Sequence, residues 1–201
     1  MEPLAVVAMA ALPLATSCTS DAAPGPEQEN TSAEHEEDNH DDSTTVEFDD
    51  LRFADHPDLQ EFNFTDEEDV DYGLVTPEWA EKYEAQELRA EDPTPEQVRV
   101  ILKDTEPPLN SFLGLQMGLE MADPDGFEHD IEDQLEFPGA VGGAVMRSNY
   151  TNHPQENVTR QWDIILQTEE SPMYHIRYGG AEDEFNEDYA NELLDSLEVN
   201  R

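Results

Sequence analysis

The sequence contains one cysteine, few basic residues and no long apolar segment after its first residues. Cys18 is the only cysteine among 201 residues, which excludes a framework of intramolecular disulfides. Lysine and arginine together number nine, so the chain lacks the clustered cations with which proteins bind nucleic acid phosphates. The N-terminal apolar run is too short to span a bilayer, and no later apolar segment could span one. We therefore expect neither a nucleic acid partner nor a membrane-spanning domain.

Recognisable catalytic motifs are also missing. The sequence has no Gly-x-Ser-x-Gly, His-Glu-x-x-His, P-loop or dinucleotide-binding pattern. Its carboxylates lie close together everywhere, so their spacing carries no information about acid–base chemistry. We predict no catalytic residues, no metal ligands and no cofactor. A hydrolase with an unrecognised carboxylate site is a minor alternative.

Acidic residues dominate the composition. Aspartate and glutamate number 50, and the formal net charge is −41. Such a surface is typical of halophile proteins, because at about 1 M salt the Debye length is only about 3 Å and the repulsion is screened. A cation-binding surface is the alternative interpretation. The spread of acids over the whole chain favours the first, and in either case an anionic membrane surface would repel the protein.

The N-terminus has a short apolar run that ends near Cys18. The apolar run at residues 4–15 has about the length of a signal-peptide core, and it is followed by Thr16, Ser17 and Cys18. This pattern resembles a prokaryotic lipoprotein signal, in which the cysteine becomes the lipidated first residue of the mature chain. The resemblance implies that residues 1–17 are removed and that Cys18 anchors the protein on the outer face of the membrane. A plain secretion signal and a buried N-terminal helix are the alternatives.

The remainder divides into a linker and one domain. Residues 18–44 contain no aromatic or large aliphatic residue, so we predict a disordered acidic linker. Residues 45–201 have enough apolar residues for one α+β globular domain.

The first half of this domain gives mixed signals. Thr76 and Pro77 mark the start of a helix over residues 77–90. Residues 94–103 carry both a helix-start signal and strand-like alternation, so both assignments stay open. Alternating apolar residues predict a strand over 112–121, and a short helix is expected through Ile131 and Leu135.

The C-terminal part gives clearer patterns. Strands are predicted at residues 140–150, 160–167 and 173–178, with close backbone approach at Gly142 and Gly143. A four-residue spacing of apolar side chains from residue 185 to 197 predicts an amphipathic closing helix. Three strands in meander order and a helix over one face make an antiparallel sheet flanked by helices. On the polar face of the last strand, His175 is expected to be solvated.

Five segments share the order of one known fold: residues 77–79, 138–145, 159–166, 172–178 and 192–199. Together they resemble the Mog1/PsbP-like fold, which includes extracytoplasmic lipoproteins. The resemblance implies a sheet between helices, a non-enzymatic role and binding to protein partners. We therefore expect a lipid-anchored binding or scaffolding module with a protein partner in the cell envelope, contacted through the sheet face that the closing helix leaves open or through loops at the strand ends.

One loop partly matches a calcium-binding pattern. Asp123, Asp125, Gly126 and Glu132 fall at positions three, five, six and twelve of such a loop, whereas Met121 stands where the first carboxylate belongs. An acidic turn that caps a helix is the simpler interpretation. The alternative function is therefore a cation-binding cell-surface protein that uses its acidic linker and the 123–132 turn.

The lipid anchor predicts a specific mass for the mature N-terminus. Mass spectrometry of the protein from native membranes should show a chain that begins at Cys18 and carries a covalent lipid. An N-terminus with Met1 intact would contradict both the lipoprotein and the secretion interpretations.

Overall fold

The computed structural model describes residues 45–64, 70–104, 106–152 and 156–200. The predicted signal peptide, Cys18 and the linker at 18–44 lie outside the described residues. The described helices are α1 (Pro77–Glu84), α2 (Pro108–Ala122) and α3 (Glu187–Ser196). The described strands are β1 (Thr45–Phe48), β2 (Leu51–Ala54), β3 (Gln60–Glu61), β4 (Tyr72–Val75), β5 (Gln97–Lys103), β6 (Glu128–Leu135), β7 (Gly142–Asn152), β8 (Asn157–Gln167), β9 (Met173–Ala181) and β10 (Glu198–Val199).

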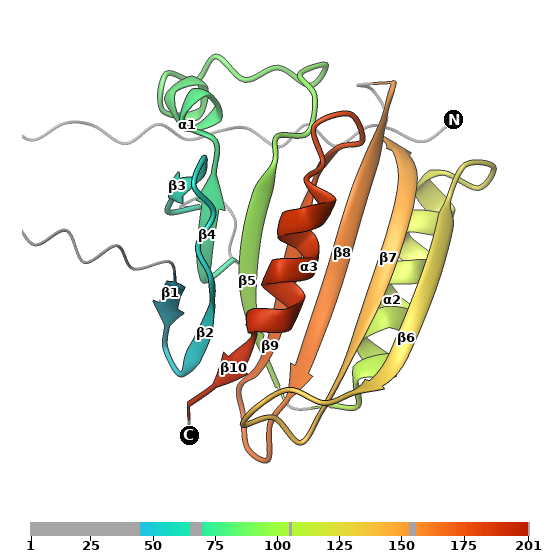
Figure 1. Ribbon diagram of the computed structural model, residues 1–201. Coiled ribbons are helices and arrows are strands. Elements are labelled where there is room, and N and C mark those ends of the chain that lie inside the picture. Colours follow the sequence, from blue (N-terminus) through green and yellow to red (C-terminus); the bar gives the residue numbers. More distant parts are fainter. Residues whose placement is uncertain (1–44, 65–69, 105, 153–155, 201) are drawn as a thin grey trace, which may run out of the picture. The chain divides into compact units, whose positions relative to one another are not determined.

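Within the described residues, seven strands form one antiparallel sheet in the order β3-β4-β5-β9-β8-β7-β6 (Figure 1). The strands β7, β8 and β9 are neighbours both in sequence and in the sheet, which confirms the predicted meander. A second described sheet has the order β1-β2-β10. In it, Glu198 of β10 lies opposite Arg52 of β2, so the chain returns to the first hairpin after α3.

The predicted closing helix is present and covers one face of the large sheet (Figure 1). Its first turn is capped by Asn186, whose side-chain oxygen accepts a hydrogen bond of 3.1 Å from the Tyr189 amide. Tyr189 and Leu193 of α3 belong to the same buried cluster as Trp162 and Ile164 of β8. The alternation along β8 and the four-residue spacing along α3 therefore describe two surfaces that pack together.

The opposite face of the sheet is covered by α2, and the prediction of a strand over residues 112–121 is wrong. The inner side of α2, with Phe112, Leu115 and Leu119, packs on a cluster from three strands of the sheet. That cluster consists of Ala144, Met146, Ile165 and Met173. Leucine, methionine and glutamine favour helices, and the segment has no β-branched residue. Because α2 is apolar on both its inner and outer sides, its sequence lacks the contrast between a polar and an apolar side that usually identifies a helix.

Three other segments refine the predictions. Residues 97–103 form strand β5, which settles the open assignment at 94–103 in favour of a strand. The predicted helix at 77–90 is confirmed, but it ends at Glu84. The predicted helix through Ile131 and Leu135 is wrong, because this segment is strand β6 at the edge of the sheet. A spacing of four fits either structure, and a register shift between Asp133 and Leu135 further obscures the alternation.

Close backbone approach is confirmed at Gly143 but not at Gly142. A Cβ atom on Gly143 would lie 2.4 Å from the Phe137 ring and 3.0 Å from the Ile165 carbonyl oxygen. A Cβ atom on Gly142 would meet only the Gln167 side chain, at an ordinary 3.7 Å. The absence of a side chain at Gly143 therefore lets the loop after β6 pack against the sheet.

These neighbouring glycines give a matched pair of substitutions. Gly143→Ala should lower the free energy of unfolding by about 1–3 kcal/mol, because the new methyl group forces Phe137 or the strand to move. Gly142→Ala should change it by much less. Chemical denaturation of both variants in molar salt measures the difference, and equal losses would contradict this packing.

Candidate functional site

The outer side of α2 is an exposed apolar row. Leu109, Leu113, Met117 and Met121 recur every four residues, and their exposed fractions are 43%, 58%, 62% and 80%. We call these side chains the α2 stripe. In the described residues, the other large apolar side chains with comparable exposure are Val141, just before β7, and Val158, in β8. Neither belongs to a row of exposed apolar side chains. The α2 stripe is therefore the one place in the described chain where exposed apolar side chains form a continuous row.

Two exposed glycines lie beside this row. Gly114 and Gly118 are also four residues apart, and a Cβ atom on either would meet no atom within 4 Å apart from the neighbouring backbone of α2 itself. The only ionisable side chain of the helix is Glu120, although a quarter of the residues in the whole chain are acidic. The outer side of α2 thus combines an exposed apolar row, two exposed glycines and little charge.

A buried charge cluster lies on the sheet face that α2 partly covers. Asp163 of β8 is fully buried and lies opposite Met146, which packs against α2. Its Oδ1 is 2.7 Å from His175 Nε2 and accepts a 2.9 Å hydrogen bond from Arg177 Nε. Its Oδ2 accepts a 2.6 Å hydrogen bond from Gln161 Nε2. Three donors from β8 and β9 thus surround this one carboxylate.

The cluster fixes the charge of its members. Burial alone would raise the pKa of the Asp163 carboxyl, but Arg177, His175 and Gln161 together hold that pKa well below its ordinary value. Burial lowers the pKa of His175 more than Asp163 raises it, so the imidazole is neutral at neutral pH. The folded state then binds fewer protons than the unfolded state below about pH 6.5. Stability contributed by His175 is therefore lost as the pH falls below that value.

The expectation that His175 is solvated is wrong, because its exposed fraction is 3%. It does lie on the polar side of β9, but that side faces a covered part of the molecule. Asp163 and His175 resemble an acid–base pair, yet Asp163 is closed to solvent and its acceptors already bind three donors. The arrangement joins β8 to β9 and leaves no oxygen of the carboxylate directed at a substrate.

A second buried polar group joins the first hairpin to the large sheet. His56 Nε2 lies 3.3 Å from Glu96 Oε1, and Tyr178 donates its hydroxyl hydrogen to the same carboxylate. The Asn186 amide in turn donates to the Tyr178 oxygen at 3.1 Å. Burial and the neighbouring Glu96 raise the pKa of Tyr178 far above its ordinary value, so it stays protonated as a donor. These contacts fix the start of α3.

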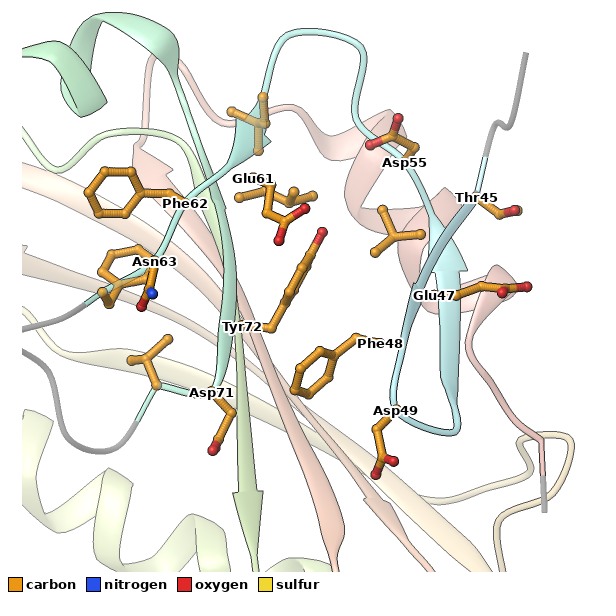
Figure 2. Close-up of a pocket in the computed structure, with 15 residues that line it drawn as sticks. Thr45, Glu47, Phe48, Asp49, Asp55, Glu61, Phe62, Asn63, Asp71 and Tyr72 are labelled. Carbon is orange, nitrogen blue, oxygen red and sulfur yellow. The ribbon is translucent and has the colours of Figure 1, made fainter. Parts of the chain in front are cut away.

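A cleft of about 730 Å³ lies between the β1–β2 hairpin and the β3–β4 region (Figure 2). In its centre, the rings of Phe48 and Tyr72 stack with their centroids 5.1 Å apart. Burial, together with the charges of Glu61 and Asp55, raises the pKa of Tyr72 to about 12. The cleft is therefore a negatively charged, aromatic hollow.

Most carboxylates at the rim of this cleft have structural partners. Asp49 accepts a hydrogen bond of 3.1 Å from the Tyr174 hydroxyl, and Asp71 accepts one of 2.8 Å from the Leu102 amide. Asp55 accepts one of 2.9 Å from the following backbone amide. These carboxylates hold loops in place.

The 123–132 turn is also structural. Asp123 accepts hydrogen bonds from the Gly126 amide at 3.0 Å and the Thr151 amide at 2.7 Å. Glu132 lies on strand β6 and binds Arg147 at 3.0 Å, so it does not close a calcium loop. In the part of the chain that the structure describes, no group of three or more His, Cys, Asp or Glu side chains is placed to hold a metal ion.

The predicted site residue, Cys18, lies outside the described residues. The exposed apolar row that forms the α2 stripe was not predicted from the sequence. The signal was present as the four-residue spacing from Leu109 to Met121. It was hidden because Leu113, Leu115, Met117 and Leu119 also alternate as a strand would.

None of the described helices has both the length and the apolar character required to cross a membrane. Comparison of the chain with protein-family models finds no match, and comparison with curated proteins finds none either.

The charge cluster gives a quantitative prediction. Asp163→Asn should lower the free energy of unfolding by about 3–5 kcal/mol, because Arg177 loses its buried counter-charge. As the control, Glu187→Gln breaks the exposed 3.2 Å pair with Arg160 and should cost about 0–1 kcal/mol. Denaturant titration in molar salt measures both variants. A loss for Asp163→Asn no greater than that of the control would contradict a structural role for the cluster.

Proposed function

We propose that this chain is a lipid-anchored binding or scaffolding module on the outer face of a prokaryotic cell membrane, and that it is not an enzyme. Cys18 carries the lipid, and residues 18–44 hold the domain away from the membrane. The domain docks a protein surface through the α2 stripe. The observation that carries the proposal is this row of exposed apolar side chains on a chain in which 50 of 201 residues are acidic.

The energetics of α2 support a docking role. Each Å² of apolar surface left in water costs about 25 cal/mol, and salts that strengthen apolar burial increase this cost. A helix that only covered the sheet would need apolar residues on its inner side alone. Here the outer side holds two leucines and two methionines, and methionine adapts readily to a partner's contours. A protein partner that covers the stripe accounts for these residues.

The fold and the buried clusters support the same function. An antiparallel sheet between helices agrees with the resemblance to Mog1/PsbP-like domains, which generally bind protein partners. The polar side chains in the sheet bind one another, so they favour a structural role over catalysis. The alternative cation-binding function has weaker support, because Asp123 and Glu132 of the 123–132 turn already have protein partners.

Site-specific photocrosslinking in native envelopes tests the docking surface. A photoreactive residue in place of Met117 should form adducts with protein in molar salt. The same residue in place of Glu192, which is exposed on α3, should not. Leu113→Asp in the Met117-labelled chain should suppress the adducts, because a carboxylate in the stripe must be desolvated on docking.

Leu113 is largely exposed, so its substitution should leave the melting temperature nearly unchanged, which serves as the folding control. Identical adducts at the two labelled positions, or adducts that survive Leu113→Asp, would rule out α2 as the docking surface.

A further inference from the structure

We propose that the cleft between the β1–β2 hairpin and the β3–β4 region binds a guanidinium group, and that an arginine side chain of a partner protein supplies it. The cleft lies at the β3–β4 end of the large sheet, whereas α2 packs against β7, β8 and β9. It is therefore a second surface, and its role does not depend on the docking role proposed for the α2 stripe.

The cleft combines aromatic rings with a carboxylate. The rings of Phe48 and Tyr72 stack with their centroids 5.1 Å apart, and both side chains are half-buried, so part of each remains exposed. In Figure 2 the Tyr72 hydroxyl and the Glu61 carboxylate point toward one another. A cation is attracted both by the negative face of an aromatic ring and by a carboxylate, so the two kinds of group act together on it.

The negative charge of the cleft is not neutralised by its own lining. Of the 15 described residues that line it, none is lysine or arginine, and five are acidic: Glu47, Asp49, Asp55, Glu61 and Asp71. The printed partners of the three aspartates are uncharged hydroxyl or amide groups, which leave the negative charge in place. Within the part of the chain that the structure describes, the Glu61 carboxylate has no hydrogen bond or ion pair. The cleft therefore favours a cation from outside.

The same domain holds its own guanidinium groups between a ring and a carboxylate. Two arginines lie in this way, namely Arg147 with Trp162 and Glu132, and Arg160 with Phe185 and Glu187. The guanidinium carbons lie 4.7 and 4.9 Å from the ring centroids, and the nitrogen–oxygen distances are 3.0 and 3.2 Å. Phe48 and Tyr72 with Glu61 offer the same two kinds of group, so an arginine from a partner would complete a third such arrangement.

The rings decide which cation the cleft prefers. In molar salt, inorganic cations compete for any exposed carboxylate, and the Debye length of about 3 Å screens attraction at longer range. A guanidinium group is planar and more weakly hydrated than an ammonium group, and it stacks on aromatic faces. The aromatic part of the site therefore favours arginine over lysine and over inorganic cations. The cleft volume of about 730 Å³ also leaves room for the backbone that flanks an arginine.

NMR titration of the full chain in molar KCl tests the site, with Cys18→Ser to remove the proposed lipid attachment. The probe is Nα-acetyl-arginine amide, whose only charge is the guanidinium group. It should shift the amide signals of β1, β3 and β4 with a dissociation constant of about 10⁻³ M, because one ring contact and one exposed charge pair contribute little. The citrulline derivative, which has the same shape without the charge, should cause no such shifts. The lysine derivative should bind more weakly than the arginine derivative.

Two pairs of variants separate the carboxylate from the ring. Glu61→Gln should weaken binding of the arginine derivative about twofold to fivefold, whereas Glu128→Gln, at the opposite edge of the same sheet, should not. Tyr72→Leu should weaken it about threefold to tenfold, whereas Tyr72→Phe keeps the ring and should bind nearly as well. Glu61 is exposed, so the first pair decides even if Tyr72→Leu lowers the melting temperature.

The source of the guanidinium group needs a separate comparison. A blocked pentapeptide with arginine between glycines should bind at least about threefold more tightly than methylguanidinium, because its backbone also contacts the cleft. Equal binding of these two probes would overturn the assignment to a protein partner. Equal binding of the citrulline and arginine derivatives, equal effects within either pair of variants, or signal shifts spread over β6 would overturn the site itself.

Discussion

Repulsion among carboxylates is the constraint on which the rest of this structure depends. The few cations must therefore lie where they contribute most to the fold. Three arginines of the sheet lie over aromatic rings: Arg99 over Phe64 at 4.6 Å, Arg147 over Trp162 at 4.7 Å and Arg160 over Phe185 at 4.9 Å. A fourth, Arg177, neutralises the buried Asp163. An arginine over a ring covers apolar surface with its stem and is attracted by the negative face of the ring.

The same constraint explains why α2 is unusual. On most of this surface a carboxylate is the ordinary residue, and it keeps separate molecules apart. A contact between proteins has to form where that repulsion is absent, and α2 provides such a place on the outside of a helix whose inside closes the core. One element therefore serves both the stability of the sheet and the proposed recognition of another chain. The acidic edge strand β6 beside it limits the directions of approach.

The C-terminal half of the fold could be predicted because α3 has one polar and one apolar side, and because polar residues alternate with apolar ones along much of β8 and β9, although Ile165 and Met173 on the second face are apolar. The alternation in β8 and β9 and the spacing in α3 follow directly from that contrast. The contrast is lost in α2, which is apolar on both sides, and the spacing of Ile131 and Leu135 in β6 fits either structure. His175 was misjudged for a related reason. The alternation identified its side of β9 as polar, but only the packing of the described chain reveals that this side is covered.

Met117 and Met121 are the most exposed members of the α2 stripe and the two most solvent-accessible large apolar side chains of the described residues. A thioether in that position is open to oxidants, and conversion to the sulfoxide makes the side chain polar. Oxidation of these two sulfur atoms would make half of the stripe polar, and both side chains are too exposed to be part of the core. Enzymatic reduction of the sulfoxides would restore the apolar character, so the chemistry of the proposed docking surface is reversible.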